Sequence, residues 1–312
     1  LTIYQTILQI SQNKMVKVVL TGSIGNIGKP LTKLLVKGGH NVTVITSNAD
    51  RVKDIEELGA AARVGSNEDT SFLAATFAGA DVVYIMVPPK YSEPDNTAYY
   101  VRLSTAAATA IRTAGVKKAI LLSSYGAHLP SGTGFILGSF HSEKILGEVE
   151  GLSLTVIRPG YFYYNLINFF KTMIQHAGFM GSNYGGSDKL HFVYTEDIAE
   201  AIAEEVVAPA QAGVKVRYVV SDIRTCDETA ALLGPAIGKP ELKWVTFTDE
   251  QAVQGMLQGG LPAPAAAQAA DLGASLHSGA LGSHYETLSD QQLGKVKLED
   301  YIRNEFVAAF NA

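Results

Sequence analysis

Three glycines spaced three residues apart, Gly22, Gly25 and Gly28, follow the first strongly apolar run of the chain. A glycine loop between a strand and a helix lets a pyrophosphate approach the backbone, and the helix N-terminus offers it free N–H groups and a partial positive charge. The first glycine permits the tight turn, the second the close approach, and the third the packing of helix on strand. We therefore predict a dinucleotide-binding loop formed by Gly22, Ser23, Gly25, Asn26, Ile27 and Gly28.

The end of the second predicted strand should distinguish between the two nicotinamide nucleotides. An acidic residue there would bind the adenosine ribose and repel a 2′-phosphate. This chain has Thr46, Ser47 and Asn48 instead, with Arg51 one turn later. Hydroxyl, amide and guanidinium groups can all donate to a phosphate, so the pattern favours NADP(H) over NAD(H). The alternative, nearly as strong, is that Arg51 is an ordinary solvated helix residue.

Alternating apolar runs and helical patterns must position these residues. We predict strands at 15–20, 41–45, 62–64, 81–87, 118–123 and 154–158, and helices at 26–37, 50–58, 70–77, 94–114 and 139–150. Strict alternation with short links indicates a parallel sheet with right-handed crossovers and helices on both faces. The predicted fold class is α/β, a Rossmann-type doubly wound parallel sheet with a smaller, mainly helical C-terminal lobe.

The regular alternation of predicted strands and helices ends after Pro159, which suggests a division into domains. We expect a leader or extension at 1–14, and an NAD(P)-binding Rossmann domain at 15–160 that also receives 190–222. Residues 161–189 and 223–312 should form a small substrate lobe. The tyrosines and phenylalanines within 161–170 could line a flat apolar pocket for an aromatic molecule, although about half of them must belong to the core of the lobe.

Composition excludes several classes of protein. The 312 residues are 47% hydrophobic with 25 basic and 30 acidic side chains, a net charge of -5, which excludes intrinsic disorder. No cluster of Lys and Arg indicates nucleic acid as a partner, and no apolar run is long enough to span a membrane. We expect no metal, because no His, Cys and acidic cluster has ligand spacing. A single cysteine, Cys226, makes the cytoplasm the simplest compartment. Whether the chain forms a homodimer is left open.

The glycine loop and its place in the chain resemble the short-chain dehydrogenase/reductase superfamily. Residues 142–146 with 154–165, and residues 192–199, look like the "E-x-x-L … T-x-L-R-P-G-x-F-x-x-N" and "F-V-x-x-x-D-I-A" segments of its atypical, NmrA-like branch. The tail from 238 to 310 is also similar to the C-terminal lobe of that branch. The resemblance therefore covers roughly residues 15–310.

The resemblance implies a Rossmann domain that binds NAD(P)(H) and a small lobe that closes over the nicotinamide. Known members include NAD(P)H-dependent quinone, azo-dye and phenylpropanoid reductases, and also nucleotide-sensing regulators. The Tyr-x-x-x-Lys dyad of the superfamily is absent, because Phe140 stands four residues before Lys144 and no tyrosine has a lysine at that spacing. Ser47 stands where the branch often has Arg, and Ser66 stands where it often has an adenine-contacting Asp. Ser66 itself or the backbone of Asn67 could replace that Asp.

The remaining candidates come from the ends of the predicted strands. Tyr125 and His141 could donate a proton, and the alternative for His141 is a structural role. Lys144 could contact the nicotinamide ribose or be an exposed helix lysine, with equal weight. The expected catalytic residues are Lys144, Tyr125 and His141. The further cofactor-binding candidates are Ser47, Asn48, Arg51, Ser66, Asn67, Val87, Pro88, Pro89, Ser123, Ser124, Lys144, Pro159 and Gly160. The substrate candidates are Tyr125, Tyr161, Phe162, Tyr163 and Tyr164.

These observations support two functional hypotheses. In the first, the protein is an NAD(P)H-dependent reductase that passes hydride to a small aromatic or quinone-like acceptor. In the second, it is a non-catalytic sensor of the nucleotide that acts through a protein partner. The missing dyad fits both hypotheses, and the aromatic segment favours the enzyme.

Overall fold

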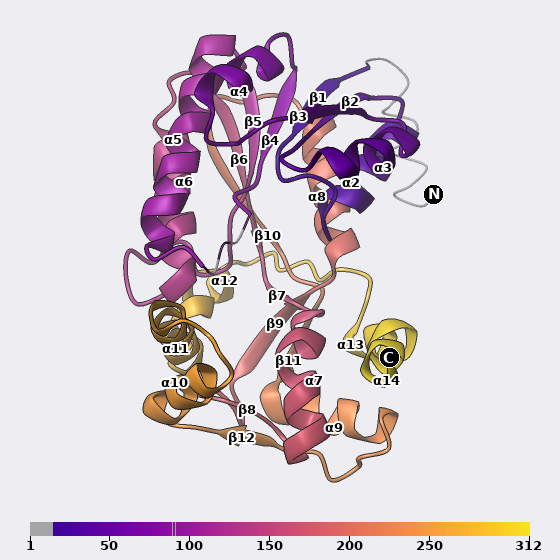
Figure 1. Ribbon diagram of the computed structural model, residues 1–312, viewed down its shortest axis with the longest axis vertical. Helices are drawn as coiled ribbons and strands as arrows, with labels where there is room; N and C mark the ends of the chain where they lie inside the picture. The colour runs from indigo at the N-terminus through magenta and orange to yellow at the C-terminus, as the bar shows by residue number, and fades with distance from the viewer. Residues whose placement is uncertain (1–14, 89, 91) are drawn as a thin grey trace.

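The computed structural model describes residues 15–312 except residues 89 and 91 (Figure 1). Residues 1–14, where we expected a leader or extension, lie outside the described part. The large sheet contains β1 (Lys17–Leu20), β2 (Asn41–Thr46), β3 (Ala61–Val64), β4 (Val82–Ile85), β5 (Lys118–Leu122), β6 (Ser153–Pro159) and β10 (Gly213–Val219). Their order is β10-β6-β5-β4-β1-β2-β3, and every neighbouring pair is parallel. The strand order reverses between β1 and β4, which is where ligands of such sheets bind.

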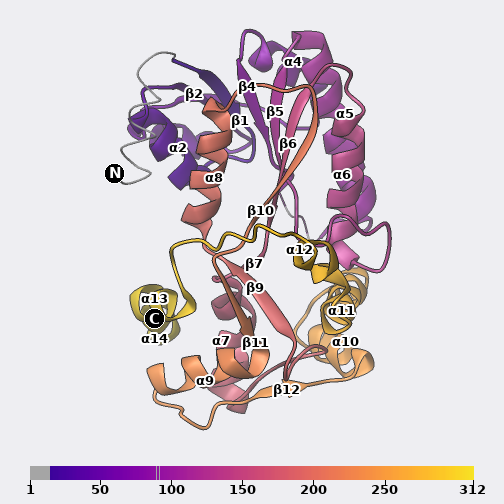
Figure 2. The ribbon, with the colours of Figure 1, turned by 180° about the vertical axis from the view of Figure 1, so that it is seen from behind.

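Helices cover both faces of this sheet (Figures 1 and 2). One face carries α2 (Gly28–Lys37), α3 (Val52–Glu57) and α8 (Thr195–Val207), and the other carries α4 (Thr70–Phe77), α5 (Asn96–Ala114) and α6 (Leu137–Gly147). The first layer buries Leu31 and Ile198 against β1 and β4, and the second buries Phe77 and Ile111. Two separate apolar cores therefore fix the sheet from opposite sides.

Side-chain caps set where several of these helices begin. The carboxylate of Asp69 accepts from the N–H of Phe72 at the start of α4, and that of Asp95 accepts from Ala98 at the start of α5. Each cap satisfies an N–H group that the helix itself leaves without a partner. Short 3₁₀ turns, η1 (Ala49–Arg51) and η2 (Gly134–Ile136), lead into α3 and α6.

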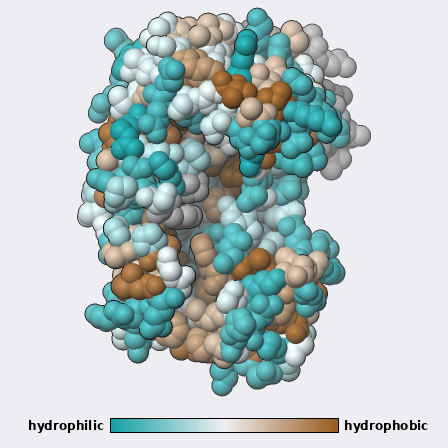
Figure 3. All heavy atoms as spheres, viewed as in Figure 1, coloured by the Kyte–Doolittle hydropathy of each residue, from teal (hydrophilic) through white to brown (hydrophobic). Residues whose placement is uncertain are grey.

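A smaller lobe is built on two short sheets and several helices. The strands are β7 (Tyr161–Phe162), β9 (Lys189–Val193) and β11 (Asp222–Thr225) in one sheet, and β8 (Met180–Ser182) and β12 (Trp244–Thr246) in the other. The helices are α7 (Asn165–Ala177), α9 (Cys226–Ala236), α10 (Asp249–Gln258), α11 (Ala263–His277), η3 (Ala280–Gly282), α12 (Ser283–Glu286), α13 (Leu298–Tyr301), the π-helical η4 (Ile302–Phe306) and α14 (Val307–Asn311). Figure 3 shows a hollow between this lobe and the part of the molecule that carries the large sheet.

The predicted fold class is confirmed, with two corrections. The fourth strand ends at Ile85 and not at Val87, because the N–H of Met86 donates to the hydroxyl of Thr21 at 2.8 Å. Within 190–222, which we assigned to the Rossmann domain, α8 and β10 do pack with the large sheet. However, β9 pairs with β7 and β11 in the smaller lobe. None of the helices in the described part of the chain has the length and apolar character that crossing a membrane requires.

Candidate functional site

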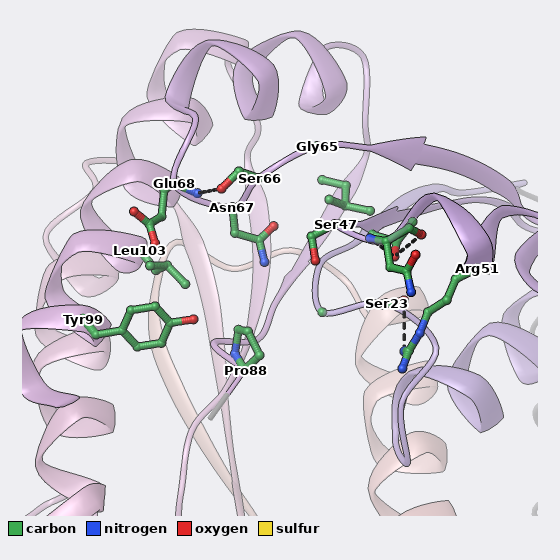
Figure 4. Close-up of a pocket in the computed structure, with 14 residues that line it drawn as sticks. Ser23, Ser47, Arg51, Gly65, Ser66, Asn67, Glu68, Pro88, Tyr99 and Leu103 are labelled. Atoms are coloured by element: carbon green, nitrogen blue, oxygen red, sulfur yellow. Dashed lines mark hydrogen bonds between the residues drawn. The ribbon is translucent and has the colours of Figure 1, made fainter. Parts of the chain in front are cut away.

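A cavity of about 340 Å³ lies at the carboxyl ends of β1 to β4 (Figure 4). It is bordered by the glycine loop, the ends of β2 and β3, the segment after β4, and one turn of α5. The lining residues are Gly22, Ser23, Ile45, Thr46, Ser47, Asn48, Arg51, Gly65, Ser66, Asn67, Glu68, Pro88, Tyr99 and Leu103. Eight of the predicted cofactor-binding residues are among them: Gly22, Ser23, Ser47, Asn48, Arg51, Ser66, Asn67 and Pro88. We call this cavity the nucleotide pocket.

The glycine loop is held in place by backbone geometry. Gly22 has φ +84°, a left-handed conformation that favours glycine. A Cβ on Gly28 would lie 2.1 Å from the carbonyl oxygen of Ser23, so only glycine lets α2 begin this close to the loop. The hydroxyl of Thr21 contacts both backbone groups of Met86, which ties the loop to the end of β4.

Gly25 differs from its two neighbours in the motif. A Cβ built on it would meet no atom within 4 Å, so the fold itself does not require glycine there. The open space at Gly25 is where a pyrophosphate would approach the backbone in such a loop. This separation of roles, with two glycines serving the fold and one facing open space, is what a phosphate-binding loop needs.

Polar groups gather beside the loop at the end of β2. The guanidinium of Arg51 donates to the hydroxyl of Ser23 at 3.4 Å, and Asn48 accepts from the N–H of Asp50 at 2.9 Å. Arg51, Ser47 and Asn48 are all exposed and border the pocket. A cation and two further donors thus converge on one edge of the cavity, a donor set suited to a phosphate.

The opposite end of the pocket combines an apolar wall with polar groups from the segment after β3. Tyr99 and Leu103 line it from α5 and pack against Val87, another predicted residue, which supports the wall from behind. Figure 4 shows Asn67 projecting between Tyr99 and Ser47. The side-chain oxygen of Asn67 is buried without a hydrogen-bond partner in the described structure. A base with an amino group would satisfy that oxygen, since buried polar atoms are normally paired. These residues, taken with the open face of Gly25, fit NAD(P)(H).

Several members of the pocket were missed by the sequence analysis. Tyr99, Leu103 and Glu68 line the cavity but belong to no glycine motif or strand end, so no local signal marked them. Of the predicted residues, Pro89 lies outside the described part of the chain. Gly25, Asn26, Ile27 and Gly28 are in the glycine loop but do not border the cavity, and Ile27 is buried against the core.

A second group of residues lies at the ends of β5, β6, β9 and β10. The hydroxyl of Tyr125 and Nδ1 of His191 are 2.7 Å apart, and their rings are 4.9 Å apart. The rings of Tyr218 and Tyr285 surround Tyr125, each with its centroid 6.3 Å away. We call Tyr125, His191, Tyr218 and Tyr285 the aromatic cluster. His191, Tyr218 and Tyr285 were not predicted, because they come from β9, β10 and α12 and only the fold brings them to Tyr125.

A chain of polar contacts runs beneath this cluster. Glu143 on α6 accepts two hydrogen bonds from Arg158, at 2.9 and 2.6 Å, and a third from the hydroxyl of Ser123. Arg158 donates in turn to Tyr218 at 2.9 Å, and Tyr218 is 2.8 Å from Nδ1 of His284. Glu143 and Arg158 are largely buried, so this pair orders the strand ends as one unit. Ser123, predicted to bind the cofactor, therefore donates its hydroxyl hydrogen bond to Glu143 in this structure.

The other predicted catalytic residues lie apart from the aromatic cluster. Lys144 is exposed on α6, and its ammonium is 5.8 Å from the ring centroid of Phe140. His141 is half-buried, with its ring 5.3 Å from that of Phe140. Of the three predicted catalytic residues, only Tyr125 lies next to other titratable side chains of the aromatic cluster, His191 and Tyr218.

The remaining predicted residues around β6 and β7 are divided, with some in the core of the smaller lobe and some beside the aromatic cluster. Tyr163 is 1% exposed and stacks between Phe192 and Tyr301, so its assignment to the substrate pocket is wrong and it belongs to the core. Tyr161 contacts the hydroxyl of Tyr184 at 3.3 Å. Three further predicted residues are close to the cluster or to each other. The carbonyl of Pro159 accepts from Tyr125, Gly160 packs against the backbone of His191, and Ser124 donates to the carbonyl of Tyr125. The rings of Phe162 and Tyr164 stack at 5.0 Å.

The fold and the glycine loop define a Rossmann-type protein of the short-chain dehydrogenase/reductase kind. The profile of the NmrA-like family matches residues 14–271, and the chain belongs to that family. It is 25% identical over 247 residues to the NAD(P)H azoreductase of Xenophilus azovorans, covering 78% of this chain and 82% of that protein.

Two solved structures share the fold. The NADPH-dependent quinone oxidoreductase QOR2 of Escherichia coli, in complex with NADPH, has a TM-score of 0.76 at 19% identity and covers 93% of this chain and 99% of its own. The triphenylmethane reductase of Citrobacter sp., complexed with NADP(H), has a TM-score of 0.72 at 19% identity, with 92% and 99% covered. At these identities the likeness establishes the architecture.

Proposed function

We propose that the protein is an NAD(P)H-dependent oxidoreductase that reduces a small aromatic or quinone-like acceptor. The nucleotide pocket and the adjoining glycine loop carry this proposal, because the open space at Gly25, the donors at the end of β2 and the unpaired Asn67 oxygen together suit a nicotinamide dinucleotide. Membership of the NmrA-like family and similarity to an azoreductase and a quinone oxidoreductase support the same activity.

The edge of the pocket at β2 supports NADP(H) as the preferred cofactor. The guanidinium of Arg51 is anchored to Ser23, and Ser47 and Asn48 add neutral donors. An adenosine 2′-phosphate would meet these groups and no carboxylate at the tip of β2, whereas NAD(H) would leave the arginine unused.

The residues of the chain have separate tasks in this proposal. Bound NAD(P)H supplies a hydride, and the protein supplies binding and orientation. The glycine loop and Arg51 bind phosphates, Tyr99 and Leu103 flank the base, and Lys144 contacts ribose hydroxyls. Tyr125 donates a proton to an acceptor whose hydride adduct is a strong base, whereas a quinone adduct can take its proton from water. Phe162 and Tyr164 provide neighbouring apolar surface. Residues 15–160 with α8 and β10 act as the nucleotide domain, and the rest forms the acceptor lobe. We place this reaction in the cytoplasm, where a single free thiol such as Cys226 is stable.

Absorbance of the reduced nicotinamide tests the proposal. The protein is mixed with NADPH or NADH and with a panel of quinones and azo dyes. We expect oxidation of NADPH that depends on both acceptor and protein, and a Gly25→Asp variant should show none. Tight binding of NADPH without oxidation by any acceptor would instead support a non-catalytic sensor, and no binding of either nucleotide would refute both functions.

A further inference from the structure

The hydroxyl of Tyr125 is held from two directions at the carboxyl end of β5. His191 on β9 places Nδ1 2.7 Å from it. On another side, a Cβ built on Gly282 would lie 2.5 Å from the same oxygen, so the backbone at the end of η3 closes against it. His191 is 5% exposed and its backbone is fixed in the β9 ladder. The position of the phenol is therefore set by rigid elements of the smaller lobe.

The aromatic cluster also contains a buried hydroxyl group that makes no hydrogen bond within the described part of the chain. Tyr285 is 3% exposed, and its hydroxyl has no hydrogen-bond partner among the described residues. Its ring centroid lies 5.2 Å from that of His191 and 5.4 Å from that of Tyr218. A buried hydroxyl without a partner costs free energy, and a bound molecule with an acceptor atom would remove that cost. The cluster is thus suited to receive a polar atom of an aromatic ligand.

The protonation states of the pair assign different roles to its two members. Burial lowers the pKa of His191 to about 4, so the imidazole is neutral near pH 7 and has no proton to release as an acid. Burial raises the pKa of Tyr125 above its ordinary value, so the phenol keeps its proton. In this pair the tyrosine carries the transferable proton and the histidine orients it.

We propose that His191 is a positioning residue that holds Tyr125 as the proton donor, and that the pair favours acceptors whose hydride adduct is a strongly basic anion. An azo group is such an acceptor. This inference rests on the proposed function, because the adduct forms only if the protein carries out nicotinamide-dependent reduction.

The chemistry of the two acceptor classes explains the preference. When one nitrogen of an azo group has gained a hydride, the electron pair remains on the other nitrogen, which is a far stronger base than a phenolate. The O–H bond of Tyr125 then breaks, an N–H bond forms, and the negative charge moves to the phenolate, which accepts a hydrogen bond from Nδ1–H of His191. Water reprotonates the phenolate afterwards. A quinone adduct is itself a phenolate, so proton transfer from a tyrosine with a raised pKa gains little there.

Four proteins and two acceptors test the inference. Wild type, Tyr125→Phe, His191→Leu and His191→Asn are assayed for kcat and KM with methyl red and with menadione, at saturating NADPH. For methyl red we expect Tyr125→Phe to lower kcat about 100-fold, because general acid catalysis contributes on this order. We expect a change below about 5-fold for menadione. His191→Leu should lower kcat for methyl red, and His191→Asn should restore most of it, because the Asn amide lies near the place of Nδ1.

The outcomes separate this inference from the proposed function. Equal losses with both acceptors, no loss with methyl red, or a wild type that reduces menadione only would overturn the role of the pair and leave the reductase intact. A wild type that reduces neither acceptor would overturn the proposed function itself. A second measurement needs no turnover: the imidazole nitrogen resonances of His191 in nucleotide-free protein should move in Tyr125→Phe. Unmoved resonances would show that the hydrogen bond does not form and would overturn the inference.

Discussion

The nucleotide pocket and the aromatic cluster lie at the same edge of one sheet but are built in different ways. The pocket is formed mainly by backbone and polar groups that follow the ends of β1 to β4, with Tyr99 and Leu103 added from α5. The cluster uses large side chains from β5, β9, β10 and α12, which are up to 160 residues apart, counting from Tyr125 to Tyr285. A binding function common to a whole fold can be carried by a local motif. Recognition of a particular acceptor relies on side chains that the smaller lobe brings in.

A substitution in the glycine loop should have the largest effect on nucleotide binding. Gly25→Asp should weaken NADPH binding by more than about 100-fold in calorimetry, since its carboxylate would occupy and repel the phosphate site. The urea midpoint should change little, because the space around Gly25 is open. Gly28→Ala is the matched variant, since its Cβ would lie 2.1 Å from the backbone of Ser23 and should destabilise the fold. If Gly25→Asp bound NADPH like the wild type, the pocket would have a different ligand.

The aromatic cluster should lose stability as the pH falls. The folded pKa of His191 is about 4, against 6.5 for the free side chain. Between these values the unfolded chain binds a proton that the folded protein excludes, so stability is complete above pH 6.5 and falls as the pH decreases toward 4. The loss from this residue should be about 3 kcal/mol by urea unfolding.

His191→Asn, which cannot titrate, is the control for that measurement. Its free energy of unfolding should fall less steeply over the same pH range. The difference between the two slopes isolates His191 from the other histidines whose pKa burial also lowers, His40 and His128. Identical slopes would mean that His191 is not neutral and enclosed as the structure has it.

A third, smaller effect should distinguish the phosphate edge of the pocket. Arg51→Ala should raise the Kd for NADPH about 10-fold, because it removes a charge-assisted hydrogen bond, and should leave the Kd for NADH unchanged. Arg63→Ala is the matched control, since Arg63 is an exposed arginine on β3 that does not line the pocket. Equal losses for both nucleotides would assign Arg51 to the shared part of the cofactor and remove the argument for NADP(H).

The nucleotide pocket could largely be predicted from the sequence, whereas most of the aromatic cluster could not. Gly22, Gly25 and Gly28 are recognisable because a strand, a turn and a helix must follow one another within a few residues. The sheet follows from apolar runs of strand length. His191 and Tyr285 carry no such signal, because a buried histidine and a core tyrosine have the same local pattern whether or not they meet Tyr125. Tyr163 illustrates the converse: it belongs to an aromatic run that suggested a pocket, but only its stacking on Tyr301 shows that it is core.

The smallest effect is expected at Lys144, on the helix between the two regions. Its ammonium is exposed and near the Phe140 ring, so a contact to ribose hydroxyls would be made largely in water. Lys144→Ala should therefore raise the KM for NADPH only about threefold, in line with a single hydrogen bond of modest net value. Lys117→Ala, an exposed lysine just before β5 at the opposite edge of the sheet, should change nothing. A loss in kcat of more than about 100-fold for Lys144→Ala would move the acid–base chemistry from the aromatic cluster back to α6, where the superfamily keeps its dyad.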